Sequence, residues 1–398
     1  WVMRVVAVQS GNSVDGIDVV VADITGAEGT VGPEVAPGAV EYTVVAFETA
    51  PWPQEDKQEL LRVRETGGSL SQIQDLNLRL GKVFARTVLE VLRKRGVRLD
   101  TVDLVASHGQ TINAPPHWEI GDPSVIASVT GITTVGDFRP ADIGCDGNGS
   151  PCSHLFDVLC LRTDHWRAAI NIGGFGAVAL VPPLGCSEPP RALETGPGVI
   201  FMDLAAKVVD PSLEYDTDGD LAAAGRVDDV LLSEMKAHPF FSKPPPRVAG
   251  PTDFTMALFE SWMKRGEELG LSSKDFVATI TELTAWSVVD SLCKLGADTD
   301  DIVLRGQITK NKTFMRRFGV LCSEWRGQEV QARSLDEVGF DSESWETVIY
   351  AIMGYLCSLG KFNNVMHFTG ATRPAVLGKL CPGGNFHALM SHCHSKPE

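Results

Sequence analysis

The chain has 398 residues, of which 43% are hydrophobic and 22% are charged, and its formal net charge is −16. This length suggests two domains, each with an ordinary packed core. The acidic balance argues against a nucleic-acid binder or a membrane-surface protein, and no apolar run reaches the roughly 20 residues that a membrane span needs. Nine cysteines without a CxxC pair indicate reduced thiols, so we expect a cytoplasmic protein.

The first 50 residues contain three β-rich runs, Val2–Val8, Ile17–Ile24 and Tyr42–Phe47. The turn between the first two runs carries Ser10, Gly11, Asn12, Ser13, Asp15 and Gly16. Such a turn can direct backbone N–H groups at phosphate oxygens, and Asp15 or Asp18 can hold Mg²⁺ through water. A plain hairpin turn would have a similar composition, so both interpretations stay open.

Helical spacing over Leu70–Arg95 precedes a short buried strand that starts at Leu104. This strand runs into His108, Gly109, Gln110 and Thr111. A histidine at a strand end can bind a substrate hydroxyl, although a lone histidine is more often structural. Pro123–Thr130 is predicted to be a short helix with proline near its start.

Asp137 follows a strand-like run, Ile132–Val135, and Arg139 and Asp142 come soon after it. A carboxylate just past the end of a strand lies where α/β sheets place their ligands, so Asp137 is the candidate base. Arg139 can grip an anion or keep Asp137 ionised through its opposite charge. The structural alternative is a buried Asp–Arg pair that ties down a loop.

The second half repeats the opening pattern. A strand over Arg167–Ile172, a turn at Gly173 and Gly174 and a strand over Ala177–Val181 predict a second phosphate-binding hairpin, and hence two related α/β domains around a cleft. A further turn with Gly196 and Gly198 precedes a helix from Val199 whose N-terminus can take an anion.

Residues 215–254 are expected to form a long loop, because acidic residues and a Pro-rich run dominate them. A capped helix through Leu295, a strand at Ile302–Leu304 and a helix over Ser344–Leu359 follow. Glu346 in the first turn of that last helix suits the helix dipole and can alternatively hold a sugar hydroxyl. The tail residues His392, Cys393 and His394 have no second cluster that would complete a metal site.

Several ordered motifs resemble the anhydro-N-acetylmuramic acid kinase family. They are SGNSVDGID from Ser10, LVASHGQT from Leu104, ITTVGDFRPAD from Ile132, NIGG from Asn171, TGPG from Thr195, YDTDG from Tyr215 and VLGKL from Val376. The tail motif CPGGNF from Cys381 is similar to the fungal levoglucosan kinases of that family.

The resemblance implies an actin-like fold of the sugar kinase–Hsp70 superfamily, with two duplicated ribonuclease H-like domains around ATP and Mg²⁺. We expect domains at 1–137, completed by part of 360–398, and at 138–359, with a loop-rich insertion near 210–255. Family members open a 1,6-anhydro bridge with water and phosphorylate O6 of a small sugar. The resemblance also implies a homodimer, with no nucleic-acid or membrane partner.

The same resemblance assigns roles to individual residues. Asp137, Arg139 and Glu346 are the predicted catalytic set, and the predicted substrate-binding residues are His108, Gln110, Thr111 and Asp142. The nucleotide and phosphate set comprises the Ser10–Gly16 turn together with Gly173, Gly174, Gly196, Gly198 and Gly306.

The chain departs from the family pattern mainly on the nucleotide side. Arg305-Gly306-Gln307-Ile308 stands where the family has a CGGG-type adenosine loop, so side chains occupy space that the backbone leaves free in relatives. Three hypotheses therefore remain: an ATP-dependent anhydrosugar kinase, a repurposed enzyme that uses Asp137 as acid or base without ATP, and a non-catalytic scaffold.

Overall fold

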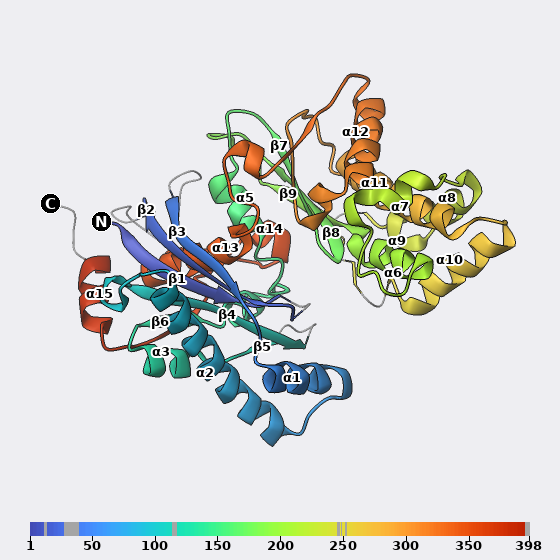
Figure 1. Ribbon diagram of the computed structural model, residues 1–398. Coiled ribbons are helices and arrows are strands. Elements are labelled where there is room, and N and C mark those ends of the chain that lie inside the picture. The colour runs from blue at the N-terminus through green and yellow to red at the C-terminus, as the bar shows by residue number, and fades with distance from the viewer. Residues whose placement is uncertain are drawn as a thin grey trace. The chain divides into compact units, whose positions relative to one another are not determined.

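The computed structural model describes residues 1–11, 14–27, 40–113, 118–244, 247, 249–250 and 253–394. It forms two compact units, which Figure 1 shows with their elements labelled. The first comprises Trp1–Cys160 and Glu343–Glu398, and the second comprises Leu161–Ser342. The first boundary therefore lies after Cys160, later than the expected one after Asp137. The second lies before Glu343, earlier than the expected one before residue 360, because α13 (Trp345–Ser358) packs on strands of the first unit.

The first unit is built on one twisted sheet with the strand order β12-β6-β4-β1-β2-β3, and β5 pairs with β4. β1, β2 and β3 are antiparallel neighbours, whereas β4 and β6 run parallel to β1 and β12 returns antiparallel to β6. The strands are β1 (Met3–Gln9), β2 (Ile17–Thr25), β3 (Glu41–Ala50), β4 (Leu104–Asn113), β5 (Trp118–Ile120), β6 (Thr134–Gly136) and β12 (Lys379–Cys381).

Two long helices cover the two faces of this sheet. Val6 and Val8 of β1 pack in one cluster with Leu80 and Phe84 of α2 (Leu70–Lys94). On the other face, Gly354 of α13 lies against Ala106 of β4, so closely that an added Cβ would come within 2.7 Å of the alanine Cβ. The remaining helices are α1 (Gln54–Thr66), α3 (Pro123–Thr130), α4 (Arg139–Ile143), α5 (His154–Cys160), α14 (Met366–Thr369), α15 (Phe386–His394) and the 3₁₀ turn η1 (Leu99–Thr101).

The second unit has a sheet of the same design, in the order β11-β10-β7-β8-β9. β7, β8 and β9 are antiparallel, and β10 and β11 run parallel to β7. In each sheet, the first three strands are antiparallel, and the parallel strands extend the sheet next to the first of the three. The second sheet therefore repeats the arrangement of β1–β4 and β6, and the predicted duplicated α/β fold is confirmed. The strands are β7 (Arg167–Ile172), β8 (Phe175–Val181), β9 (Arg191–Pro197), β10 (Ile302–Arg305) and β11 (Ala332–Ser334).

Helix α11 (Ser273–Lys294) forms the core of the second unit. It begins at Ser272, whose hydroxyl and the carboxylate of Asp275 make the predicted capping box. Its length and apolarity would suffice for a membrane span, but 83% of that stretch is buried inside the unit, as in the core helix of a globular domain. Besides the short helices over 220–242, the unit has α6 (Val199–Val209), α10 (Met256–Glu268), α12 (Lys312–Arg326) and the 3₁₀ turns η2 (Thr217–Gly219), η3 (Gln307–Lys310) and η4 (Asp336–Val338).

The expectation of a long loop over 215–254 is wrong for the residues that the structure describes. This stretch forms α7 (Asp220–Ala224), α8 (Asp229–Lys236) and α9 (Pro239–Ser242). Its apolar residues explain the difference, because the side chains of Leu231, Met235 and Phe240 are buried in the core of the unit. Among the described acidic and proline residues of this stretch, Asp220, Asp229 and Pro239 are the first residues of α7, α8 and α9.

Candidate functional site

A cavity of about 360 Å³ opens in the first unit beside the carboxyl end of β6. Polar side chains from three strands and the start of α3 line it, which is the composition expected of a site for a hydroxylated ligand. The lining residues are Asn77, Ser107, His108, Gly109, Trp118, Glu119, Ile120, Gly121, Asp122, Pro123, Ser124, Asp137, Lys379 and Cys381.

Asp137 lies at the wall of this cavity, directly after the last residue of β6. Its backbone adopts the left-handed conformation with φ of 56°, which few non-glycine residues adopt. The carboxylate forms an ion pair with the ammonium group of Lys379, and the Asp137 side chain remains 22% exposed. An ionised carboxylate at a solvent-reachable cavity wall can accept a proton from a bound water.

His108 enters the cavity through an irregularity in β4. The pairing of β4 with β1 shifts between Ser107 and Gly109, so His108 is the extra residue of a β-bulge. Gly109 has φ of 77°, which the bulge requires and glycine allows without strain. The ring of His108 packs at 4.5 Å between centroids on Tyr350 of α13.

Arg139 lies behind His108 and is buried. Its guanidinium forms an ion pair with Glu119 and donates to the carbonyl of Gly149 at 2.7 Å. A third N–H lies 3.2 Å from His108 Nε2, so this nitrogen acts as the acceptor and the proton of the neutral ring lies on Nδ1. Arg139 therefore fixes the tautomer of His108, an arrangement that orients the Nδ1–H donor.

Glu119 is the partner of Arg139 that the sequence analysis missed. Burial raises the pKa of Glu119, against the lowering effect of the Arg139 charge. Because Arg139 pairs with Glu119 and Asp137 pairs with Lys379, the predicted direct Asp137–Arg139 pair is replaced by two separate ion pairs. The only sequence signal for Glu119 was a single acidic residue in the apolar stretch WEI, and Lys379 appeared within the VLGKL motif without an assigned role.

Three further predicted substrate-binding residues take part in internal contacts. Thr111 donates to Glu119 at 3.4 Å, and the side-chain amide of Gln110 donates to the carbonyl of Gly11 at 3.3 Å. The Asp142 carboxylate is fully engaged inside the unit, where it accepts from the Gly149 amide, the Thr369 hydroxyl and the Asn364 amide at 2.9, 2.9 and 3.1 Å. Asp142 thus organises loops behind the cavity rather than lining it.

Glu346 lies in the first turn of α13, as expected, and its side chain is exposed. It is not among the residues that line the cavity around Asp137. Its negative charge contributes to raising the pKa of Tyr350, one turn further along the helix, where burial is the largest cause. The structure therefore brings Asp137, His108 and Lys379 together and leaves Glu346 outside this group.

The first glycine turn connects β1 to β2. The Ser10 hydroxyl donates to the Gly16 carbonyl at 2.9 Å and accepts from the Trp52 indole at 3.1 Å, so it closes the turn itself. Asn12 and Ser13 lie outside the described residues. Burial raises the pKa of Asp18, whose carboxylate accepts from Thr49 at 2.6 Å, whereas Asp15 is exposed. Asp15 is consequently the more available carboxylate of this turn.

The second glycine turn, at Gly173 and Gly174, has room around both Cα positions, because an added Cβ would meet nothing closer than 3.9 Å. This is the open backbone surface that a phosphate group requires. The two glycine carbonyls accept from the amides of Gly198 and Val199, so these amides at the start of α6 are not directed at an anion as predicted. The nearby Gly196 has φ of 129°, and its turn packs against Phe241.

Gly306 is the one glycine in Arg305–Ile308, the segment that stands where the family pattern has a CGGG-type loop. It has φ of 98°, and an added Cβ would lie 2.6 Å from the Ile172 carbonyl, so glycine is required there. Arg305 before it is fully buried, and η3 follows at once. Within the described part of the chain, no three His, Cys, Asp or Glu side chains gather into a metal-binding group.

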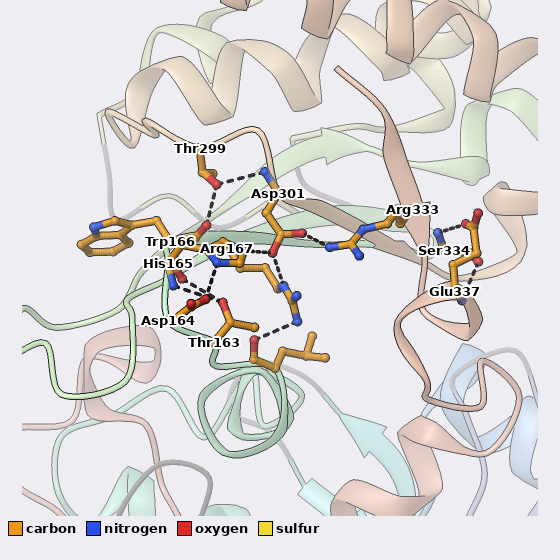
Figure 2. Close-up of polar contacts among 11 residues, drawn as sticks. Thr163, Asp164, His165, Trp166, Arg167, Thr299, Asp301, Arg333, Ser334 and Glu337 are labelled. Atoms are coloured by element: carbon orange, nitrogen blue, oxygen red, sulfur yellow. Dashed lines mark hydrogen bonds and ion pairs between the residues drawn. The ribbon is translucent and has the colours of Figure 1, made fainter. Parts of the chain in front are cut away.

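The second unit has a broader hollow of about 710 Å³ that the sequence did not indicate. Figure 2 shows several of its polar residues: Asp164 and His165 precede β7, Thr299 and Asp301 precede β10, and Arg333 lies in β11. The Asp301 carboxylate accepts from His165 at 2.7 Å and from Arg167 at 2.8 Å, and it also pairs with Arg333. The acidic and basic side chains of this cluster pair with one another and link the segments of three strands. We therefore do not take the cluster as the candidate active site.

The duplicated sheets, the open glycine turn and the carboxylate at a strand end are the features expected of a phosphotransferase of the sugar-kinase type. A model of the family "Anhydro-N-acetylmuramic acid kinase" matches residues 3–383. The chain is 32% identical over 394 residues to the anhydro-N-acetylmuramic acid kinase of Caldanaerobacter subterraneus subsp. tengcongensis, covering 94% of this chain and 96% of that one. It is 33% identical over 408 residues to that of Acidithiobacillus ferrooxidans, covering 100% and 96%.

The chain therefore belongs to the anhydro-N-acetylmuramic acid kinase family. Among solved structures, it is similar to the activator of the 2-hydroxyisocaproyl-CoA dehydratase from Clostridium difficile, with a TM-score of 0.44 and 12% identity, covering 89% of this chain and 94% of that one. It is also similar to the ROK hexokinase from Thermus thermophilus, with a TM-score of 0.37 and 12% identity, covering 89% and 99%.

Proposed function

We propose that this protein is an anhydrosugar kinase that opens a 1,6-anhydro bridge with water and transfers a phosphoryl group from ATP to the freed O6. The observation that carries the proposal is Asp137, held in a left-handed backbone conformation at the wall of a polar cavity. Strained residues persist where the surrounding structure holds them, and they cluster at functional sites. Family membership supplies the reaction class.

The proposed step assigns a proton transfer to this chain. Asp137 takes a proton from a bound water, the water oxygen bonds to the anomeric carbon, and the bond from that carbon to the bridging oxygen breaks. The freed oxygen would then bond to the terminal phosphoryl group of ATP, the bond from that group to ADP would break, and ADP would leave. In this proposal Gly173 and Gly174, whose Cα positions are open, hold the phosphates of ATP, and the exposed Asp15 holds Mg²⁺ through water.

The charges around the cavity favour an uncharged sugar as the substrate. Lys379 is the one Lys or Arg among the lining residues that the structure describes, and its ammonium pairs with Asp137. Asp122 serves as the N-cap of α3, where it accepts from the Ser124 amide at 2.8 Å. A sugar carboxylate would therefore meet acidic groups without a free cation. We expect turnover of 1,6-anhydroglucose to exceed that of an anhydrosugar acid.

The substitution Asp137→Asn tests the proposed role directly. It keeps the size and hydrogen-bonding shape of the side chain and removes its basicity, so we expect turnover to fall by about 10²- to 10⁴-fold. The measurement is phosphate transfer from ATP to 1,6-anhydroglucose, with the thermal unfolding midpoint as a control for the fold. Wild-type turnover in this variant would rule out Asp137 as the base.

A second candidate is an enzyme that uses Asp137 without ATP. The fully buried Arg305 and the commitment of the first α6 amides to Gly173 and Gly174 favour it. Calorimetric titration with Mg-ATP separates the two candidates. Binding in the micromolar to low millimolar range supports the kinase, whereas no detectable binding together with an Asp137-dependent reaction would support the second.

By analogy with its family, we also propose that the protein is a cytoplasmic homodimer.

A further inference from the structure

Lys379 is in contact with the proposed base although the two residues are far apart in the sequence. It begins β12, and its backbone lies opposite Gly136, the residue before Asp137, in the antiparallel pair of β12 and β6. The two side chains form an ion pair at the wall of the same cavity. The Lys379 side chain is 63% exposed, so its charge reaches the carboxylate from the solvent side.

The backbone around Lys379 is held tightly against β6. Gly378 has φ of 114°, and an added Cβ would lie 2.6 Å from Val135. Beyond β12, the Asn385 side chain accepts from the Thr133 amide at 2.7 Å and from the Thr133 hydroxyl at 2.8 Å. Contacts on both sides of β12 therefore fix where the ammonium group can reach.

The carboxylate of Asp137 needs such a support. It projects from a residue in a sparsely populated backbone conformation, and Glu119 and Asp122 line the same cavity with the same charge sign. Like charges repel a carboxylate towards solvent, whereas an opposite charge at a fixed point holds it. A reacting group must be held close to its productive geometry, because a misplacement of about 1 Å costs about 10²-fold in rate.

We propose that Lys379 is a positioning residue that holds the Asp137 carboxylate in its reactive orientation. This proposal rests on the proposed function, in which Asp137 is the base. Lys379 contributes little to holding the sugar, because its ammonium is committed to Asp137. The structure thus assigns the C-terminal strand a part in the reaction centre.

The test compares Lys379→Met and Lys379→Arg with a matched control. Lys94→Met removes an ion pair with Glu48 on the same unit, and the Lys94 side chain is similarly exposed, at 61%. We expect Lys379→Met to lower kcat for 1,6-anhydroglucose by about 10- to 100-fold with KM within about threefold of wild type. Lys379→Arg should restore most of this loss, and Lys94→Met should leave both constants unchanged.

A double variant ties the effect to Asp137. If the two residues act as a unit, Lys379→Met should cost nothing further in the Asp137→Asn background. An increase in KM of tenfold or more with unchanged kcat would overturn the proposal, because Lys379 would then bind the sugar. Wild-type kinetics in Lys379→Met would also overturn it. Should Asp137→Asn retain full turnover, the proposed function itself would fail, which is a separate result.

Discussion

At the scale of single residues, Asp137 shows how a short acidic side chain can serve where glycine would be the default. Aspartate tolerates the left-handed conformation better than most residues, because its short polar side chain can form local hydrogen bonds. With φ of 56° after a buried strand, Asp137 turns its carboxylate out of the sheet. Substitutions that differ in how well they tolerate this backbone conformation should therefore reveal its effect on stability.

Replacing Asp137 with alanine or glycine measures this strain. Alanine keeps the steric penalty of the left-handed conformation and glycine removes it, so we expect Asp137→Ala to be about 1 kcal/mol less stable to urea than Asp137→Gly. Asp75, exposed within helix α2, is the control position. There the order should reverse, with glycine about 1 kcal/mol less stable than alanine. The same order at both positions would contradict the assigned strain.

Glu194 in β9 predicts a pH dependence of stability. Burial raises the pKa of Glu194 to about 7, although the Ala249 amide donates to its carboxylate. The folded state therefore keeps a proton that the unfolded state loses near pH 4.5, and stability falls as pH rises between these two values. Ionised Glu194 costs the folded state on the order of 2–3 kcal/mol above pH 7.5.

The substitution Glu194→Gln should remove this cost. Urea unfolding should show the variant more stable than wild type at pH 8, with little difference at pH 4.5. Glu188→Gln, at an exposed position, is the control and should change neither value by more than about 0.5 kcal/mol. A wild-type protein whose stability does not fall between pH 5 and pH 8 relative to Glu194→Gln would contradict the prediction.

At the scale of elements, β12 is a three-residue strand whose position depends on one side chain. Asn385 accepts two hydrogen bonds from Thr133 and donates to the Asp103 carbonyl at 2.7 Å. Thr133 itself is fully buried, so its polar groups have no water to replace a lost partner. A single amide thus links the C-terminal segment to Thr133, the residue just before β6, and β6 leads directly to Asp137, the proposed base.

Asn385→Ala should therefore lower the free energy of unfolding by about 2 kcal/mol, since it leaves buried groups of Thr133 without partners. It should also reduce kcat, because β12 carries Lys379. Ser391→Ala on α15 is the control, because its exposed hydroxyl donates to the His387 carbonyl of the same helix. Denaturant unfolding and steady-state kinetics give the two readouts, and a loss equal to that of the control would contradict the proposed link.

At the scale of the whole molecule, hydrophobic periodicity predicted the fold well. The three opening strands, α2, α3, α11 and α13 lie within a few residues of their expected bounds, because each has a strong apolar repeat or a clear cap. The prediction of a long loop over 215–254 was wrong, because the short helices there are stabilised by burial of their apolar side chains and not by a local sequence pattern. Short helices of this kind have no period long enough to detect.

The candidate site was predicted only in part. Asp137 and His108 could be predicted because each lies at the end of a predicted strand, and a glycine, Gly109, follows His108. Both features are local in the sequence. Lys379 lies 242 residues after Asp137, and Glu119 lies on the separate strand β5, so only the fold shows that both reach the same cavity. The ion pairs also redistribute the charges, because Arg139 has Glu119 as its partner and not Asp137. Ion pairs between separate elements of this kind produce no recurring spacing of residues, so the sequence alone does not reveal them.

The first unit is discontinuous, and this sets the order in which the reaction centre can form during synthesis. The ribosome completes Asp137 before the whole of Leu161–Ser342, and Lys379 comes only after it. A growing chain can therefore fold the second unit while β6 still has an unpaired edge. A growing chain that has not yet reached Lys379 lacks the ion-pair partner that this residue gives Asp137. Under the proposal above, such a chain should have a lower kcat than one that includes β12.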